Sequence, residues 1–365
     1  MTVTDSKMAP SLLVWAVVAS VVAGGLFVWP LHVVMVAGQD SGVVLVGVGL
    51  WWAVVALLSP GSERFDGAWS TFNTVLQVTA CVGLMVMDVV ILAELGGMLQ
   101  TFYYFETPRW VLILVIIGVV GWGARGRGPT LWRTVFMWIP VLLGITFVTL
   151  LIALTNVHYG RVLLPNQVIV ISAQLRGFLV LAYVGLPFGA TIRSVRHVLV
   201  APSPWGWRLI ATIVPWTLLA ALYSVTMGSI GDQALVHLRW PVVFTLDHVT
   251  LDSTFFLSRV GLVVVFGWTM GVALGLMVHL RLLILVAHES VPRITPALPW
   301  VGVLFWTVGT MLLPSPDVAT RLLLTIFNPL SGIYLLVEMG FLMTWRGTRW
   351  HQRRRRTSSQ RHKEA

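Results

Sequence analysis

Residues 24–30 read GGLFVWP and residues 185–189 read GLPFG, and each stretch interrupts a long apolar run. Glycine weakens a helix, and proline removes one of its hydrogen bonds. In hydrocarbon, the freed backbone groups must be satisfied by protein or by a cavity. Two such interruptions at corresponding places in two halves predict a transporter-like site near the membrane midplane. The alternative is that both are simple kinks, since Gly and Pro are common in membrane helices.

The composition places the whole chain in a membrane. It is 57% hydrophobic and only 10% charged, with a mean hydropathy of +0.86. The single cysteine, Cys81, lies in an apolar segment, which excludes disulfides and a cysteine metal site. The polar first ten residues precede an apolar run long enough to span, so no cleavable signal peptide is expected.

We expect an all-α integral membrane protein with about ten transmembrane helices, because a bilayer core needs ~20 apolar residues per helix. Residues 1–10 form a cytoplasmic N-terminus, 11–155 and 167–345 two five-helix repeats, and 346–365 a tail. Five helices repeated with inverted topology, with helices 1 and 6 broken, is the LeuT-type architecture. The expected spans lie near 11–36, 42–59, 72–99, 108–124, 131–155, 167–192, 208–230, 254–285, 298–314 and 320–345.

The basic residues indicate the orientation. With both termini in the cytoplasm, 18 of the 24 Lys and Arg residues lie inside, four lie outside and two lie within spans. This bias agrees with the positive-inside rule. The tail is too polar to pack, so we expect it to be disordered. Its Arg cluster is expected to rest on anionic lipid rather than to bind nucleic acid.

The two interruptions supply the predicted ligand-binding residues. Small residues there let a ligand approach the backbone, and the N-termini of half-helices suit a carboxylate. The candidate ligand-binding residues are Gly24, Gly25, Leu26, Ala182, Tyr183 and Gly185.

Charged residues inside the spans are the second kind of candidate, because each is costly in hydrocarbon unless it is paired or functional. Asp88, Glu94, Arg176 and Arg259 are expected at compatible depths in the outer half. Asp88 and Glu94 are separated by about 240° around a helix and should have different partners. Glu338 is expected to snorkel or to pair locally near Arg346. Plain structural ion pairs are the alternative for the four outer charges.

The sequence contains no enzyme signature. The histidines, among them His158, His237, His279 and His288, are scattered and predict no metal site. The glycines of residues 123–128 (GARGRG) lie in a basic loop without a P-loop lysine, and nothing predicts a cofactor.

The chain carries several short motifs, which are Gly25 to Pro30, Thr107-Pro108, Trp240-Pro241, Arg259 in FFLSR, PSPD at 314–317 and Gly332-Ile333-Tyr334. In their order and spacing they resemble those of the B subunits of spore germinant receptors, a family of the amino acid–polyamine–organocation superfamily. The resemblance extends from about residue 20 to about residue 350. It departs from the family beside Arg259, where relatives usually carry acidic neighbours and this chain has Ser258 and Gly261. It also departs in the sixth span, where relatives can carry an acid near the interruption and this chain has Ala182 and Tyr183.

The resemblance implies a nutrient sensor of the inner spore membrane that works with a channel-forming A subunit and a C-subunit lipoprotein. The expected ligand is a small nutrient similar to an amino acid. Two alternatives stay open, a secondary amino-acid transporter coupled to protons or sodium, and a structural subunit without a ligand. Within the receptor interpretation, we expect Arg259 to pair with a carboxylate and to act as an outer latch that closes over the bound nutrient. The alternatives are that Arg259 is a fixed brace between helices or that it snorkels to the outer lipid headgroups.

Overall fold

The described part of the computed structural model is helical throughout and contains no β-sheet. Six helices in it are long and apolar enough to cross a membrane, which indicates a multi-pass membrane protein. They are α3 (Ser41–Leu58), α4 (Ala68–Phe102), α6 (Gly128–Ala153), α10 (Trp205–Ile230), α13 (Val260–Ser290) and the last helical segment, from Pro316 to Arg349. The described residues are 9–25, 27–38, 41–59, 68–126, 128–158, 182–195, 199, 205–247, 260–290 and 295–364.

The four other expected spans correspond to shorter helices. Helices α5 (Arg109–Ala124) and α14 (Leu298–Leu312) have 16 and 15 residues. The first expected span is divided into α1 (Leu12–Ala23) and α2 (Trp29–Ala37). The sixth is described only from η3 (Ala182–Val184) onward, followed by α9 (Gly185–Val195). The ten-helix inverted repeat therefore remains a prediction.

Both sequence interruptions coincide with a change in the helices. Helix α1 ends at Ala23, and the chain turns through Gly25, which has a φ of 104°, before α2 begins. Pro187 stands in the first turn of α9, where a missing backbone N–H costs little. The second interruption thus marks the start of a helix in the described residues.

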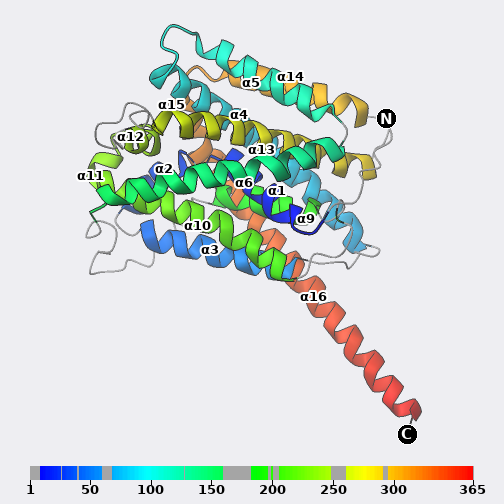
Figure 1. Cartoon of the computed structure of the whole chain (residues 1–365). Helices are drawn as coiled ribbons and strands as arrows, with labels where there is room; N and C mark the ends of the chain where they lie inside the picture. The colour runs from blue at the N-terminus through cyan, green and yellow to red at the C-terminus, as the bar shows by residue number, and fades with distance from the viewer. Residues whose placement is uncertain are drawn as a thin grey trace.

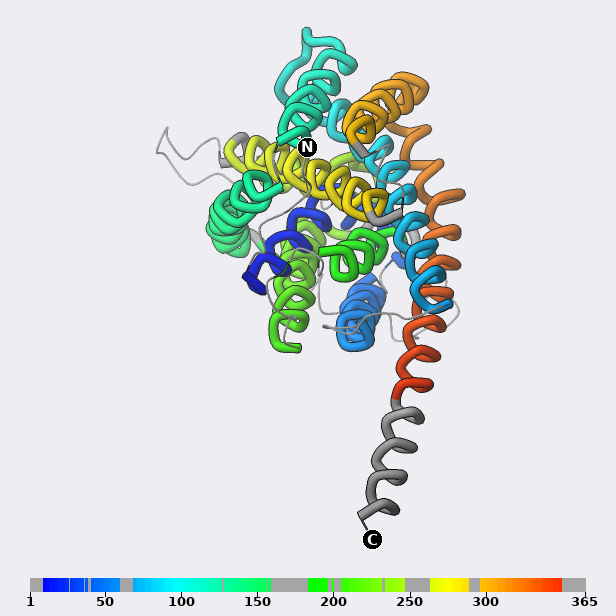
Figure 2. The backbone as a smooth tube through the Cα atoms, turned by 90° about the vertical axis from the view of Figure 1, so that its right-hand side faces the viewer, coloured from blue at the N-terminus to red at the C-terminus, as the bar shows by residue number. Residues whose placement is uncertain are grey.

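Helix α13 is the centre of the bundle and packs against α1, α4, α5, α6, α9 and α14. It also packs against the short helix α12 (Pro241–Asp247), which follows α11 (Asp232–Leu235). Helix α1 lies between α13, α10, α9 and α6, as Figure 1 shows. Helices α5 and α14 lie side by side at the periphery (Figure 2).

The peripheral helices expose large apolar side chains, as expected of surfaces that face lipid. Leu50 of α3, Trp122 of α5 and Leu304 of α14 are all exposed, whereas all but one of the α1 side chains are buried. A soluble protein of this size rarely exposes such continuous apolar surface.

The final helical segment consists of α15 (Pro316–Leu322), the π-helical turn η6 (Leu323–Phe327) and α16 (Asn328–Glu364). Helix α16 continues through the basic tail and extends away from the bundle (Figure 1), whereas the sequence predicted a disordered tail. The difference has a simple cause, because Arg, Gln, Lys and Glu all have high helix propensity and the tail simply extends an existing helix.

Candidate functional site

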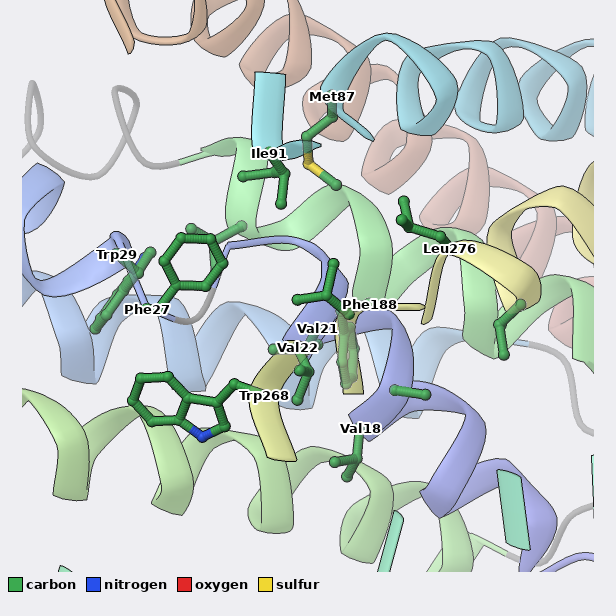
Figure 3. Packing of buried hydrophobic residues seen from close by; sticks show 14 of the residues in the cluster. Val18, Val21, Val22, Phe27, Trp29, Met87, Ile91, Phe188, Trp268 and Leu276 are labelled. Atoms are coloured by element: carbon green, nitrogen blue, oxygen red, sulfur yellow. The ribbon is translucent and has the colours of Figure 1, made fainter. Parts of the chain in front are cut away.

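The two interruptions meet inside the bundle. Helix α1 packs against α9, and a Cβ on Gly24 would lie 2.8 Å from Cγ of Pro187. Side chains from α1, α4, α9 and α13 surround Phe27 of the first interruption, among them Val22, Ile91 and Phe188 (Figure 3). The sequence elements that predicted a shared site are therefore in contact.

Gly25 has to be glycine for two reasons. Its φ of 104° is unfavourable for residues with a side chain, and a Cβ there would lie 2.6 Å from Cδ1 of Ile91 on α4. The chain between α1 and α2 is thus pressed directly against α4.

A buried polar pair joins the two interruptions. Nδ1 of His32 on α2 lies 2.6 Å from the hydroxyl oxygen of Tyr183 in η3. Both residues are almost completely buried. The backbone N–H of Tyr183 donates to Oδ1 of Asn328 at 3.0 Å. Because Asn328 directly follows the π-helical turn η6, that irregular turn helps to satisfy the backbone of the second interruption.

Three buried polar atoms of this region lack a hydrogen-bond partner in the described residues. Nε2 of His32, Nε1 of Trp29 and Nε1 of Trp52 are buried and have no hydrogen-bond partner within the described ranges. The ring of Trp52 stacks on Phe188 of α9, with ring centroids 4.8 Å apart. Buried donors and acceptors normally have partners, so these atoms mark the region as a candidate binding site.

A second polar group crosses four helices. Oδ1 of Asp88 on α4 lies 2.8 Å from Nδ1 of His279 on α13. Nε2 of His279 lies 2.6 Å from Oγ of Ser20 on α1, and the hydroxyl of Thr191 on α9 donates to Ser20 at 2.8 Å. The hydroxyl of Ser20 donates to the carbonyl oxygen of Pro187 at 3.2 Å. All four side chains are buried.

Close helix packing brings this group together. Gly275 lies one turn before His279, and a Cβ there would clash with the carbonyl oxygen of Ala19 on α1. Small residues at such contacts let membrane helices approach closely. His279 therefore reaches Ser20 from the interior of α13.

Glu94 belongs to a separate group, as its rotation from Asp88 predicted. It accepts hydrogen bonds from Nε1 of Trp240 at 3.2 Å and from the hydroxyl of Thr320. Arg239 lies 3.6 Å from Glu94 and 2.8 Å from Asp317. This arginine therefore connects α4 with the start of α15.

Glu338 pairs with Arg193 of α9, with Nε and Oε1 2.9 Å apart and both side chains fully buried. Arg193 also donates to the hydroxyl of Tyr334. The expectation that Glu338 snorkels or pairs near Arg346 is wrong, because Arg346 instead donates to the carbonyl oxygen of Leu58 at 3.0 Å. The sequence placed Arg193 in an inner loop and so gave Glu338 no deep partner.

The structure brings part of the predicted ligand site together. Gly24 lies against Pro187 of the second interruption, and Gly25 lies against Ile91 of α4. Tyr183 contacts His32. Ala182 opens η3, whereas Gly185 faces α16, since a Cβ there would lie 2.8 Å from Cδ1 of Leu335. Leu26, Arg176 and Arg259 lie outside the described residues.

Sequence reasoning missed several polar residues that complete these groups: Ser20, His32, Thr191, Arg193, His279 and Asn328. A usable signal existed for His32 and His279, which are ionisable residues inside predicted membrane spans. Ser20 and Thr191 carried no signal, because hydroxyl residues are common in membrane helices and can bond to their own backbone.

The order Asp88, His279, Ser20 has the hydrogen-bond pattern of a hydrolytic triad, but its chemistry differs. Ser20 donates its hydrogen to a backbone carbonyl, accepts from Thr191 and is fully buried, so the oxygen is not presented to a substrate. The group connects helices.

Residues 68–298, more than half of the chain, match the family model described as spore germination protein. No curated protein matches the chain. The matched range holds Asp88, Glu94, Tyr183, Arg193 and His279, and it ends where α14 begins.

Proposed function

The chain belongs to the spore germination protein family, and we propose that it is a membrane subunit of a germinant receptor. In this proposal it binds a small, amino acid-like nutrient between the two interruptions. Binding signals to a channel-like A subunit and a lipoprotein C subunit in the inner spore membrane. Members of this family are not enzymes, and the proposed role requires no catalytic chemistry.

The contact between His32 and Tyr183 is the observation that carries the proposal. It joins two backbone interruptions that are far apart in sequence, and Nε2 of His32 and Nε1 of Trp29, on the same helix, have no hydrogen-bond partner in the described residues. A ligand with a carboxylate and an amine could satisfy such atoms. The start of α2, which has nine residues, adds the partial positive charge of a helix N-terminus, which favours a carboxylate.

The architecture proposed for this role is the LeuT-type inverted repeat of residues 11–155 and 167–345, with both termini in the cytoplasm, on the side of the spore core. The division of the first span into α1 and α2 supports it, as does the start of α9 beside that division. Such a fold holds its ligand between broken helices.

A secondary active amino-acid transporter is the second candidate function. The buried pair of Asp88 and His279 favours it, because ionisable residues inside membrane helices often belong to ion or proton pathways. Purified protein in proteoliposomes separates the two functions. Saturable amino-acid uptake driven by a proton or sodium gradient would support the transporter, and its absence together with a nutrient response in spores would support the receptor.

The test of the proposed site is Tyr183→Phe, which removes only the hydroxyl that contacts His32. Loss of one buried hydrogen bond of about 1 kcal/mol should raise the nutrient concentration needed for half-maximal germination roughly fivefold. Tyr223→Phe is the matched control, since the hydroxyl of Tyr223 on α10 forms its 2.5 Å hydrogen bond with Ser41 of α3, and neither residue belongs to an interruption. Immunoblots should show equal amounts of both variants. An unchanged nutrient response of Tyr183→Phe spores would refute this site.

A further inference from the structure

A groove lies on the surface of the bundle between α5 and α6, and we call it the lateral groove. Both helices pack against α13, which lies between them in Figures 1 and 2 and forms the floor of the groove. The space within it has a volume of about 630 Å³. Trp122 at its edge is 80% exposed, so the groove opens on the lipid-facing surface. It is lined by Val119 and Trp122 of α5, Leu131 and Thr134 of α6, and Leu274 and Met277 of α13.

Two helix contacts show how the lateral groove runs along the bundle. Gly123, near the end of α5, lies against α13, because a Cβ there would be 2.6 Å from Cε of Met277. Leu142, in the middle of α6, lies against Gly267 of α13, where a Cβ would be 3.3 Å from Cδ2 of Leu142. Met270 lies between these two contacts on α13 and also lines the groove. The groove therefore extends from the connection between α5 and α6 toward the middle of the bundle, and this deeper part is apolar.

The other end of the lateral groove is polar. Arg125 directly follows α5, and Thr130 and Thr134 belong to the first two turns of α6. Arg125 is exposed, and its guanidinium carbon lies 4.7 Å from the ring centroid of Trp300 on α14. In the described part of the chain, neither a carboxylate nor another hydrogen-bond acceptor pairs with this guanidinium. Stacking on Trp300 orients the group and leaves its N–H donors available to a bound molecule.

The charge at this end suits an anion. The polar end belongs to the basic stretch of residues 123–128, GARGRG, and the described residues that line the groove include no acid. The start of α6, which carries no acidic residue in its first turn, adds the partial positive charge of a helix N-terminus. The distribution of Lys and Arg predicts that this end of the bundle faces the cytoplasm. Basic pockets between membrane helices on that side suit the head groups of anionic lipids.

We propose that the lateral groove binds an anionic phospholipid of the cytoplasmic leaflet. The phosphate accepts hydrogen bonds from Arg125, and an acyl chain lies along α13 against Ala273 and Leu274. From Val119 to Arg125, the groove extends about 9 Å along the axis of α5 at 1.5 Å per residue. It therefore holds the head group and the adjoining part of one chain, and the rest of the lipid stays in the bilayer.

An apolar segment of a partner protein is a poorer match to the lateral groove. It would place hydrocarbon beside Arg125 and satisfy none of the guanidinium donors, which is costly for a charged group. A phospholipid is charged at one end and apolar at the other, as the lining of the groove is.

The first test is native mass spectrometry of the purified full-length protein, titrated with dioleoyl phosphatidylglycerol and with dioleoyl phosphatidylcholine. Phosphatidylglycerol should bind more tightly, and Arg125→Gln should weaken its binding about fivefold. Arg133→Gln is the matched control, because this exposed arginine of α6 is not among the described residues that line the groove. Phosphatidylglycerol that binds no better than phosphatidylcholine would overturn the proposal and leave the groove to an apolar partner segment. Equal weakening by both arginine variants would also overturn it, since it would show attraction to the general surface charge.

The second test fills the apolar part of the lateral groove. Ala273→Phe places a ring where the acyl chain lies, so the tightest site for phosphatidylglycerol should be lost. Gly144→Phe is the control, since Gly144 of α6 is exposed, has open space around it and lies outside the lining. Wild-type binding of phosphatidylglycerol by Ala273→Phe would contradict the proposal. Arg125 is exposed, so the first test does not depend on a variant of the packed interior. Neither test needs nutrient or partner subunits, so their outcome is independent of the proposed receptor function.

Discussion

Gly25 shows how a single residue holds the first interruption in place. Its positive φ and its closeness to Ile91 of α4 act together, because a side chain would be strained and would also push the helices apart. The same residue type has no such role at Gly144 of α6, which is exposed and has open space where a Cβ would lie.

Gly25→Ala should therefore destabilise the protein by about 1–3 kcal/mol, the typical cost of an unfavourable backbone conformation. Gly144→Ala should be neutral or stabilising, because alanine favours the helix by up to about 1 kcal/mol. Thermal unfolding of the purified variants in detergent measures both. Equal melting temperatures of the two variants would show that the turn at Gly25 is not constrained.

The buried pair of Arg193 and Glu338 gives a second prediction for single residues. Removing one partner leaves the other charge buried, which commonly costs about 3–5 kcal/mol, whereas replacing both by apolar residues costs much less. Glu338→Leu alone should lower the melting temperature more than the double variant Arg193→Met with Glu338→Leu. A double variant less stable than the single one would mean that the pair is not coupled.

At the level of helices, Arg239 connects the start of α15 to α4. It bridges the buried Glu94 of α4 and the exposed Asp317 at the start of α15, and it lies over the ring of Trp240. The sequence predicted an arginine latch opposite these acids but assigned it to Arg259, which is outside the described residues. The prediction for Arg259 stays a prediction, and we propose Arg239 as a second candidate for such a latch within the proposed receptor function.

Arg239→Gln should shift the nutrient concentration needed for germination without loss of protein, because this arginine is partly exposed and the buried Glu94 keeps its hydrogen bonds from Trp240 and Thr320. Arg109→Gln is the control, since Arg109 donates to the carbonyl oxygen of Leu313 at the same end of the bundle but does not contact Glu94. Spore germination curves measure the shift. Loss of the Arg239→Gln protein from the membrane would instead indicate a structural brace.

Helices and their interruptions could be predicted from the sequence because length, apolarity, Gly and Pro are local signals. The contact of Gly24 with Pro187 followed from the expected symmetry of two halves. Partners across helices could not be predicted in this way: Arg193 with Glu338, or Asp88 with His279, depend on how α9, α13 and α16 are rotated. A polar residue in an apolar run reveals that a partner is needed, but rotation determines which one.

For the whole molecule, the distribution of Arg and Lys predicts that both termini lie in the cytoplasm. The natural chain has one cysteine, Cys81, which is buried, so Cys81→Ala provides a background for labelling. In intact cells, Glu106→Cys should react with a membrane-impermeant maleimide, whereas Gln352→Cys should react only after permeabilisation. The reverse pattern would invert the topology.

Helix α16 begins with Asn328, which holds the backbone of Tyr183, and continues without interruption to Glu364. At 1.5 Å per residue, its 37 residues form a rod about 55 Å long. A tilt of roughly 5° about its first turn would displace its far end by about 5 Å, by simple leverage on that length. A small change in the direction of α16 beside Tyr183 would therefore move the basic end of the chain much further than the start of the helix.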